Sequence, residues 1–231
     1  MRSLSYQSLQ DFTGLPAVRE AVASGDPGIL VLDLPVSQSD ASPKTLPQGL
    51  VVQKHGVPSS VSVTVMEKLH KFSHVVFKNL SHAVELPWEK YLGEMHEFTA
   101  PGDDELRTVS LDEPLANEWS TLVSVQFQDT MLGLLICQTI ILNASHPQQA
   151  LVLFGTALAT FTEGITSKPP GPAIDVGELA GLIGKPEGDW MVYYVRPNED
   201  VFYTRTAGAL MTPLSTLEYE QRKRIKDSKI V

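Results

Sequence analysis

The histidines are the residues whose type and spacing could do chemistry. Five of the six lie in one part of the chain: His55, His70, His74, His82 and His96. His70 and His74 are four residues apart in a stretch with helical apolar periodicity, so both imidazoles could reach one metal ion. The hypothesis that follows is a small metal-dependent enzyme, a hydrolase or another kind, with ligands at His70 and His74.

The surroundings of this pair weaken the metal hypothesis. A third ligand would have to be Glu67 or His82, and the glutamate of the H-E-x-x-H metalloprotease motif is absent. Lys71 and Lys78 lie nearby and would oppose a bound cation. A solvated helix face that carries histidines by chance is the alternative, and on that reading we assign no metal ligand and no cofactor.

Other catalytic patterns are weaker still. The acidic residues at 103–105 and 112–113 lack the spacing of a calcium loop and are expected to be solvated. Gly-x-Ser-x-Gly does not occur, and Cys137, the single cysteine, lies in an apolar run where burial makes a thiol inert. The glycine pair at 181–184 precedes Lys185, but Pro186 stands where a phosphate loop needs serine or threonine. We therefore assign no catalytic and no cofactor-binding residue.

The sharpest charge feature is a basic cluster near the C-terminus, made of Arg222, Lys223, Arg224 and Lys226. The chain as a whole has a net charge of −9, which argues against a surface built to hold nucleic acid. The cluster could bind RNA, an anionic membrane surface or a nuclear-import receptor, so an alternative function is a regulator whose basic C-terminal tail binds nucleic acid or an import receptor. The alternative is a set of cations that complements the dipole of a helix at 216–228, each contributing about 0.3–1 kcal/mol.

The elements that must position these groups are strands and helices in irregular alternation. We predict helices at Leu15–Ala23, 66–84, 87–98, 145–163 (with Ser145 and Gln148 as a capping box), 175–184 and 216–228. We predict strands at Ile29–Leu34, 50–53, 61–65, 106–111, 122–127 and 131–142, the last with a buried helix as the competing assignment. Residues 190–195 and 201–206 are predicted to form an aromatic-rich hairpin around 196–200, whose rings are core pairs or, less simply, a binding surface.

This mixture favours an α+β fold with a mixed or antiparallel sheet of several short strands and packed amphipathic helices. We expect one globular domain over residues 1–231, with flexible loops at 35–49 and 166–173. The 42% hydrophobic and 19% charged residues are ordinary for a globular protein. The apolar run at 131–142 is too short to cross a membrane, which needs roughly 20 residues.

The leading functional hypothesis is a non-enzymatic structural or interaction protein that works through self-assembly or partner surfaces. Viral matrix and coat proteins are members of that class. We expect protein partners, a homo-oligomer, and an anionic partner at the basic cluster. A single cysteine and no signal-peptide pattern favour an intracellular, cytoplasmic location, with nuclear import through residues 223–226 as an option.

Overall fold

The protein was analysed as a computed structural model, and its fold is described for part of the chain. The described residues are 3–24, 28–35, 46–47, 49–53, 60–85, 91–94, 96, 98, 104–110, 130–137, 148–162, 181–184, 189–196, 202–204 and 212–214. Every structural statement below concerns these residues.

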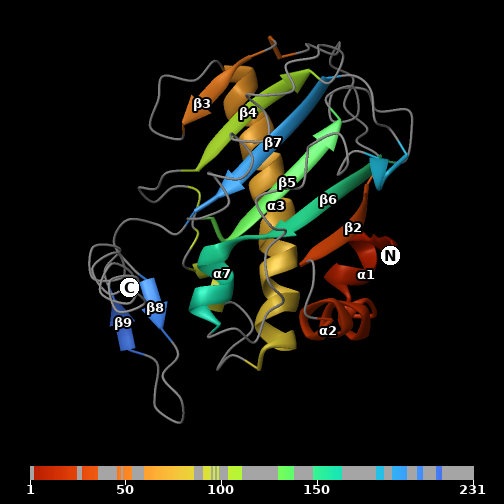
Figure 1. Ribbon diagram of the computed structural model, residues 1–231, viewed down its shortest axis with the longest axis vertical. Helices are drawn as coiled ribbons and strands as arrows, with labels where there is room; N and C mark the ends of the chain where they lie inside the picture. The colour runs from red at the N-terminus through yellow and green to blue at the C-terminus, as the bar shows by residue number, and fades with distance from the viewer. Residues whose placement is uncertain are drawn as a thin grey trace, which may run out of the picture.

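A mixed sheet is the centre of the fold (Figure 1). Seven described strands follow the order β1-β2-β6-β5-β7-β4-β3, and all neighbours are antiparallel except β1 and β2. Their bounds are β1 Ser3–Ser5, β2 Ile29–Leu34, β3 Val51–Gln53, β4 Glu105–Ser110, β5 Leu132–Cys137, β6 Gln148–Phe154 and β7 Asp189–Val195. A separate antiparallel pair is formed by β8 Phe202–Thr204 and β9 Thr212–Leu214.

One long helix, α3, runs behind this sheet along most of its length (Figure 1). The described helices are α1 Tyr6–Gln10, α2 Leu15–Ala23, α3 Ser60–Ala83, α4 Tyr91–Glu94 and α7 Thr156–Phe161. The N-terminal helices pack against α3, and the buried Asn79 amide of α3 donates a 2.7 Å hydrogen bond to the Leu9 carbonyl of α1. α3 is therefore anchored to the N-terminal helices as well as to the sheet.

The two faces of the sheet follow from the alternation of side chains along a strand. Tyr193 of β7 contacts His70 of α3, so its face is the one that α3 covers. Tyr194 must then point to the opposite face, which we call the far face. Glu105 of β4 is in register with Tyr194 and shares the far face, and Arg107 joins it two residues later.

Several predicted elements are confirmed. The helix at Leu15–Ala23 and the strand at Ile29–Leu34 have the predicted bounds. The expected helix at 66–84 forms most of α3, and the apolar run at 131–142 supplies strand β5 rather than a helix. The mixed sheet with packed helices is consistent with the predicted α+β class.

The strand predicted at 61–65 is wrong, because these residues form the first turns of α3. The alternation of valine with serine and threonine suggested a half-buried strand. On the helix, Ser62, Val65 and Met66 are all buried and lie at helical spacing. Burial of this face outweighs the strand preference of β-branched residues.

The helix predicted at 145–163 is also wrong over most of its length. Residues 148–154 form β6, which lies between β2 and β5, and only Thr156–Phe161 is helical. Gly155 separates the two elements, and its amide donates to the Met131 carbonyl at 2.9 Å. A central position in the sheet decides the conformation of a run that was apolar enough for either structure.

The predicted hairpin of 190–195 with 201–206 does not form. β7 pairs with β4 on one side and β5 on the other, whereas β8 pairs with β9. The expected elements at 122–127 and 216–228, the loop at 166–173 and most of the loop at 35–49 lie outside the described residues. Among the residues described, no helix is long and apolar enough to span a membrane.

Candidate functional site

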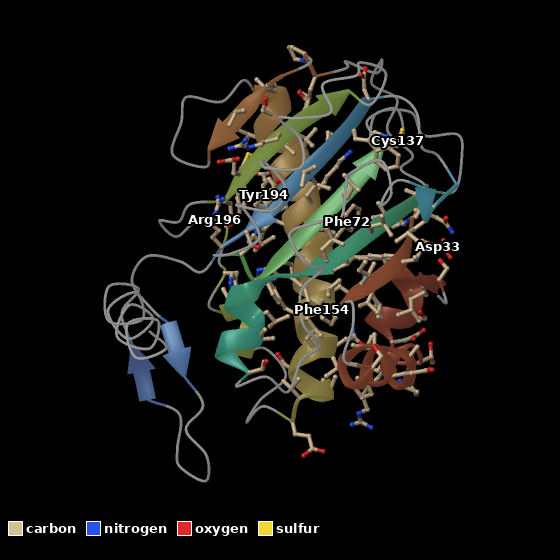
Figure 2. All side chains as sticks on the ribbon, in the orientation of Figure 1. Asp33, Phe72, Cys137, Phe154, Tyr194 and Arg196 are labelled. Carbon is tan, nitrogen blue, oxygen red and sulfur yellow. The ribbon has the colours of Figure 1, made fainter. Side chains whose placement is uncertain are left out.

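Two clusters of polar side chains lie back to back at one end of the β4–β7 pair. The consecutive residues Asp104 and Glu105 point to opposite faces, and so do Tyr193 and Tyr194. We call the group on the α3 side the histidine cluster: His70, His74, His96, Asp104 and Tyr193. We call the group on the far face the arginine cluster: Glu105, Arg107, Tyr194 and Arg196. Figure 2 shows Tyr194 and Arg196 close together at the end of β7.

A chain of hydrogen bonds joins α3 to the sheet through the histidine cluster. The Tyr193 hydroxyl donates to Asp104 Oδ2 at 2.9 Å, and His70 Nδ1 lies 3.3 Å from the same hydroxyl. Because the hydroxyl proton is directed at Asp104, the His70 Nδ1–H is the donor to Tyr193. The second Asp104 oxygen accepts from the Arg196 backbone amide at 2.9 Å. Both carboxylate oxygens are therefore occupied by donors.

The other two histidines extend this cluster along α3. His74 Nε2 donates to the His96 carbonyl at 2.9 Å, and His96 Nδ1 donates to the Leu92 carbonyl at 2.6 Å. The His96 ring stacks on Phe77, with centroids 4.4 Å apart. These contacts attach the segment around α4 to α3.

Burial shifts the pKa of two groups in this cluster, Tyr193 and His96. It raises the pKa of Tyr193 well above the usual value, and the neighbouring Asp104 carboxylate raises it further. Burial also lowers the pKa of His96 to about 4. The Nε2 atoms of His70 and His96 are buried without a hydrogen bond. In His96, which donates to the Leu92 carbonyl through Nδ1, Nε2 is a bare lone pair, which costs less to bury than an unpaired N–H.

The arginine cluster holds two guanidinium groups against one buried carboxylate. Arg107 Nε donates to Glu105 Oε1, and Arg196 Nη1 lies 4.0 Å from Glu105 Oε2. The Arg196 guanidinium also lies over the Tyr194 ring, 5.7 Å from its centroid. The side chain of Glu105 is only 4% exposed, whereas those of Arg107 and Arg196 are 21% and 18% exposed. Two guanidinium groups and one carboxylate therefore meet at a place that solvent reaches.

The rest of the described far face is apolar along its central strands. The buried residues that face it, on β2, β6, β5 and β7, are Ile29, Val31, Leu151, Leu153, Leu135, Cys137, Trp190 and Val192. At its other edge, Gln149 donates to Asp33 at 2.9 Å. The arginine cluster is thus the main charged group that we can place on this face.

The predicted site residues have different outcomes. Asp104 and Glu105 are buried, so the expectation that this acidic stretch is solvated is wrong for both. His70 is buried too and not on a solvated helix face, because it falls on the helix side that meets Tyr193. Cys137 is buried as expected. The basic cluster Arg222, Lys223, Arg224 and Lys226 lies outside the described residues.

The proposed ligand pair does not form a metal centre within the described residues. The His70 and His74 ring centroids are 4.5 Å apart, but His74 Nε2 is committed to the His96 carbonyl. No described group of three histidine, cysteine, aspartate or glutamate side chains is placed to hold an ion. The histidines instead connect α3, α4 and the sheet.

The fold is that of the 2OG-Fe(II) oxygenases. A full-length Neurospora crassa protein in complex with alpha-KG has 10% identity and a TM-score of 0.55, with 95% of this chain and 94% of that chain covered. A 2OG-Fe(II) oxygenase family protein from Caulobacter crescentus has 11% identity, a TM-score of 0.54 and coverages of 97% and 98%. A dioxygenase for auxin oxidation from rice has 10% identity, a TM-score of 0.51 and coverages of 99% and 96%. At such identities the likeness establishes the fold alone.

No family model and no curated protein sequence matches the chain. The structural likeness nevertheless corrects the leading hypothesis of a non-enzymatic assembly, coat or matrix protein, viral or otherwise. Structures of similar fold include a 2OG-Fe(II) oxygenase family protein and a dioxygenase for auxin oxidation, which contradicts the hypothesis of a structural protein. The alternative of a small metal-dependent enzyme agrees better with this fold, although not with its ligands at His70 and His74.

An iron centre of the type found in non-haem oxygenases uses two histidines and one carboxylate, with open positions for reactants. The described residues do not fit that set. In the histidine cluster, His70, His96, Asp104 and Tyr193 are buried and His74 is half-buried. Both carboxylate oxygens of Asp104 accept hydrogen bonds. The described residues of the far face include no histidine. We therefore derive no reaction step through iron.

The arginine cluster was missed because its members are far apart in the sequence. Glu105 and Arg107 show the two-residue spacing of one strand face, which was a usable signal. Arg196 reaches them only because β7 pairs with β4, and the sequence instead suggested that β7 pairs with the strand after it.

Proposed function

We propose that this protein is a small-molecule enzyme of the oxygenase fold that binds a carboxylate-bearing ligand at the arginine cluster. The observation that carries the proposal is the pair of partly exposed guanidinium groups, Arg107 and Arg196, which share the single buried carboxylate of Glu105. Arginine is the side chain best suited to grip a carboxylate, because its planar fork can donate two parallel hydrogen bonds.

The charge balance supports an anionic ligand. Within the cluster, two guanidinium groups meet one buried carboxylate, and this concentration of positive groups favours a bound anion. The site is only partly exposed, which strengthens the attraction relative to that in bulk water. Burial raises the pKa of Tyr194, so its hydroxyl stays protonated and neutral beside the cluster.

The first ligand to test is 2-oxoglutarate. Structures of similar fold were obtained with alpha-KG, which is the same small dicarboxylate. Succinate is a matched dicarboxylate without the keto group, and it separates recognition of the carboxylates from recognition of the keto acid.

The test is calorimetric titration of the full-length protein with 2-oxoglutarate and with succinate. Replacing Arg107→Met or Arg196→Met removes one charged partner while keeping an apolar stem. Hydrogen bonds to charged groups contribute about 1.5–3 kcal/mol each, so each variant should bind about 10- to 100-fold more weakly. Arg19→Met is the matched control, because Arg19 is exposed on α2.

Equal affinity in the wild type and both cluster variants would contradict the proposal, as would no binding of either acid. Circular dichroism of each variant separates a lost ligand contact from a lost fold. The assignment to small-molecule enzymes itself is tested by screening organic acids for turnover.

A second candidate is a metal-dependent oxygenase in the strict sense, because the structures of similar fold include a 2OG-Fe(II) oxygenase family protein and a dioxygenase for auxin oxidation. It predicts consumption of 2-oxoglutarate and dioxygen that requires added Fe(II). The homo-oligomer and the anionic partner of Arg222, Lys223, Arg224 and Lys226 remain predictions that are separate from this activity.

A further inference from the structure

One buried carboxylate connects the histidine cluster to the arginine cluster. Asp104 directly precedes β4, and its side chain is 3% exposed. Its Oδ2 atom accepts a hydrogen bond from the Tyr193 hydroxyl at 2.9 Å, on the α3 side of the sheet. Its Oδ1 atom accepts from the backbone amide of Arg196 at 2.9 Å. The carboxylate therefore contacts a residue of each cluster, and the two contacts use different oxygen atoms.

The bond to Arg196 lies at the point where β7 ends. The last residue of β7 is Val195, which is in register with Leu132 of β5. On its other side, the described register of β7 with β4 ends where Tyr194 lies opposite Glu105. Arg196 is the first residue beyond this strand, and a side-chain oxygen of Asp104 takes the place of a strand partner for its amide.

The position of the Arg196 guanidinium depends on where this backbone lies. Nη1 is 4.0 Å from Glu105 Oε2, and the guanidinium lies over the Tyr194 ring, 5.7 Å from its centroid (Figure 2). Glu105 and Tyr194 are fixed by their register on adjacent strands, whereas Arg196 lies beyond the strand end. Groups that bind a ligand keep their geometry when neighbouring hydrogen bonds hold them. A shift of the backbone at Arg196 would therefore move the guanidinium relative to both neighbours.

Arg107, the other guanidinium of the cluster, is held differently. It lies within β4, in register with Val51 of β3 and Val192 of β7. Its Nε atom donates to Glu105 on the same strand face. Release of the Asp104 contact should thus act on one of the two guanidinium groups and leave the other in place.

We propose that Asp104 is a positioning residue for the arginine cluster. Its Oδ1 atom holds the Arg196 backbone so that the guanidinium stays beside Glu105 and meets a ligand carboxylate, although the Asp104 side chain points to the opposite face of the sheet. The effect on ligand affinity rests on the function proposed above. The effect on the position of the guanidinium exists in the free protein and does not rest on it.

Three variants of the full-length protein separate positioning from stability. Asp104→Ala removes both contacts of the carboxylate, and Asp104→Leu, which keeps the volume, replaces it if the alanine variant does not fold. Asp104→Asn retains a side-chain oxygen that can accept from the Arg196 amide. Tyr193→Phe removes the partner of Oδ2 but leaves the carboxylate and its bond to Arg196. Circular dichroism confirms that each variant is folded at the temperature of the assay.

Calorimetric titration with 2-oxoglutarate measures the effect on affinity. We expect Asp104→Ala to bind about 10-fold more weakly, at the lower end of the loss expected for Arg196→Met. Asp104→Asn and Tyr193→Phe should stay within about twofold of the wild type. Adding Asp104→Ala to Arg196→Met should also change the affinity by less than about twofold, because Asp104 acts through Arg196. An equal loss in Tyr193→Phe and Asp104→Ala, or a full further loss in the double variant, would overturn the inference.

Nuclear magnetic resonance of the free protein measures the position of the guanidinium without a ligand. The ring current of Tyr194 shifts protons that lie over the ring, so the side-chain Nε–H resonance of Arg196 reports on this contact. The resonance is assigned by its loss in Arg196→Met. Asp104→Ala should move it toward its position in Tyr194→Leu, whereas Tyr193→Phe and Asp104→Asn should leave it in place. An unchanged resonance in Asp104→Ala would show that Asp104 does not position the guanidinium.

The two measurements distinguish failure of this inference from failure of the proposed function. If the wild type binds neither 2-oxoglutarate nor succinate, the proposed function is wrong, and the Arg196 resonance still decides whether Asp104 holds the guanidinium. If the wild type binds and Asp104→Ala binds equally tightly, the proposed function stands and the positioning role is wrong.

Discussion

The Tyr193 hydroxyl is the most informative single group to remove, because it connects His70 of α3 to Asp104, which precedes β4. Tyr193→Phe deletes the donor to Asp104 Oδ2 at 2.9 Å and the acceptor for His70 at 3.3 Å. Asp104 is buried and keeps only the Arg196 amide among these partners. Loss of a hydrogen bond to a charged group costs about 1.5–3 kcal/mol, so we expect unfolding to become easier by about 2–3 kcal/mol.

The assay is urea or thermal unfolding followed by circular dichroism. For a chain of this size, 1 kcal/mol corresponds to about 2–4 °C, so Tm should fall by about 5–10 °C. Tyr6→Phe is the control: the Tyr6 ring packs edge-on against Phe72, and no hydrogen bond from its hydroxyl to a described residue is found. A double-mutant cycle with Asp104→Asn isolates the pair. The reasoning is refuted if the two phenylalanine variants unfold at the same temperature and the coupling is near zero.

Three further outcomes follow from the structure. Gly155→Ala would place a Cβ 1.9 Å from the Thr130 carbonyl oxygen, so it should lower the free energy of unfolding by about 3 kcal/mol or more. Gly181→Ala is the control, because no atom lies within 4 Å of the added Cβ. Equal denaturation midpoints for the two variants would contradict this prediction. Burial lowers the pKa of His96 from the ordinary 6.5 to about 4 in the folded chain. Between these values the unfolded chain binds more protons, so the free energy of unfolding falls as the pH drops from 6.5 to 4, by up to about 3 kcal/mol. His96→Gln should lose that part of the pH dependence, and a parallel curve would count against it. Replacing Arg222, Lys223, Arg224 and Lys226 with alanine should remove any salt-dependent binding to RNA or anionic vesicles. If the dependence of affinity on salt concentration is unchanged in this variant, the cluster does not bind an anionic partner.

Strands and helices could be predicted from the sequence where the residue pattern of a segment fitted only one of the two. Ile29–Leu34 and Leu15–Ala23 have clear patterns, and the structure confirms them. The stretch 61–65 and the stretch 148–154 satisfied two interpretations, and tertiary packing decided each one against the local signal. The residue pattern within one segment does not show which strands will lie beside it in the folded chain.

The candidate site was harder to predict for the same reason. His70 and Asp104 are distant in sequence, and their proximity depends on α3 crossing behind β4 and β7. Acidic residues are usually solvated, so the pattern at 103–105 gave no sign that Asp104 and Glu105 enter the core on opposite faces. Two consecutive charged residues at the start of a strand point to opposite faces of the sheet, so each can belong to a different site.

The most direct test of the account is calorimetric titration of the chelator-treated, full-length protein with 2-oxoglutarate, in the presence and absence of manganese(II). The proposed ligand carboxylate binds Arg107 and Arg196, and the described residues form no two-histidine metal centre beside them. We therefore predict the same affinity with and without the metal, and weaker binding in Arg107→Met. Binding that occurs only when the metal is present, and that is unaffected in Arg107→Met, would contradict it.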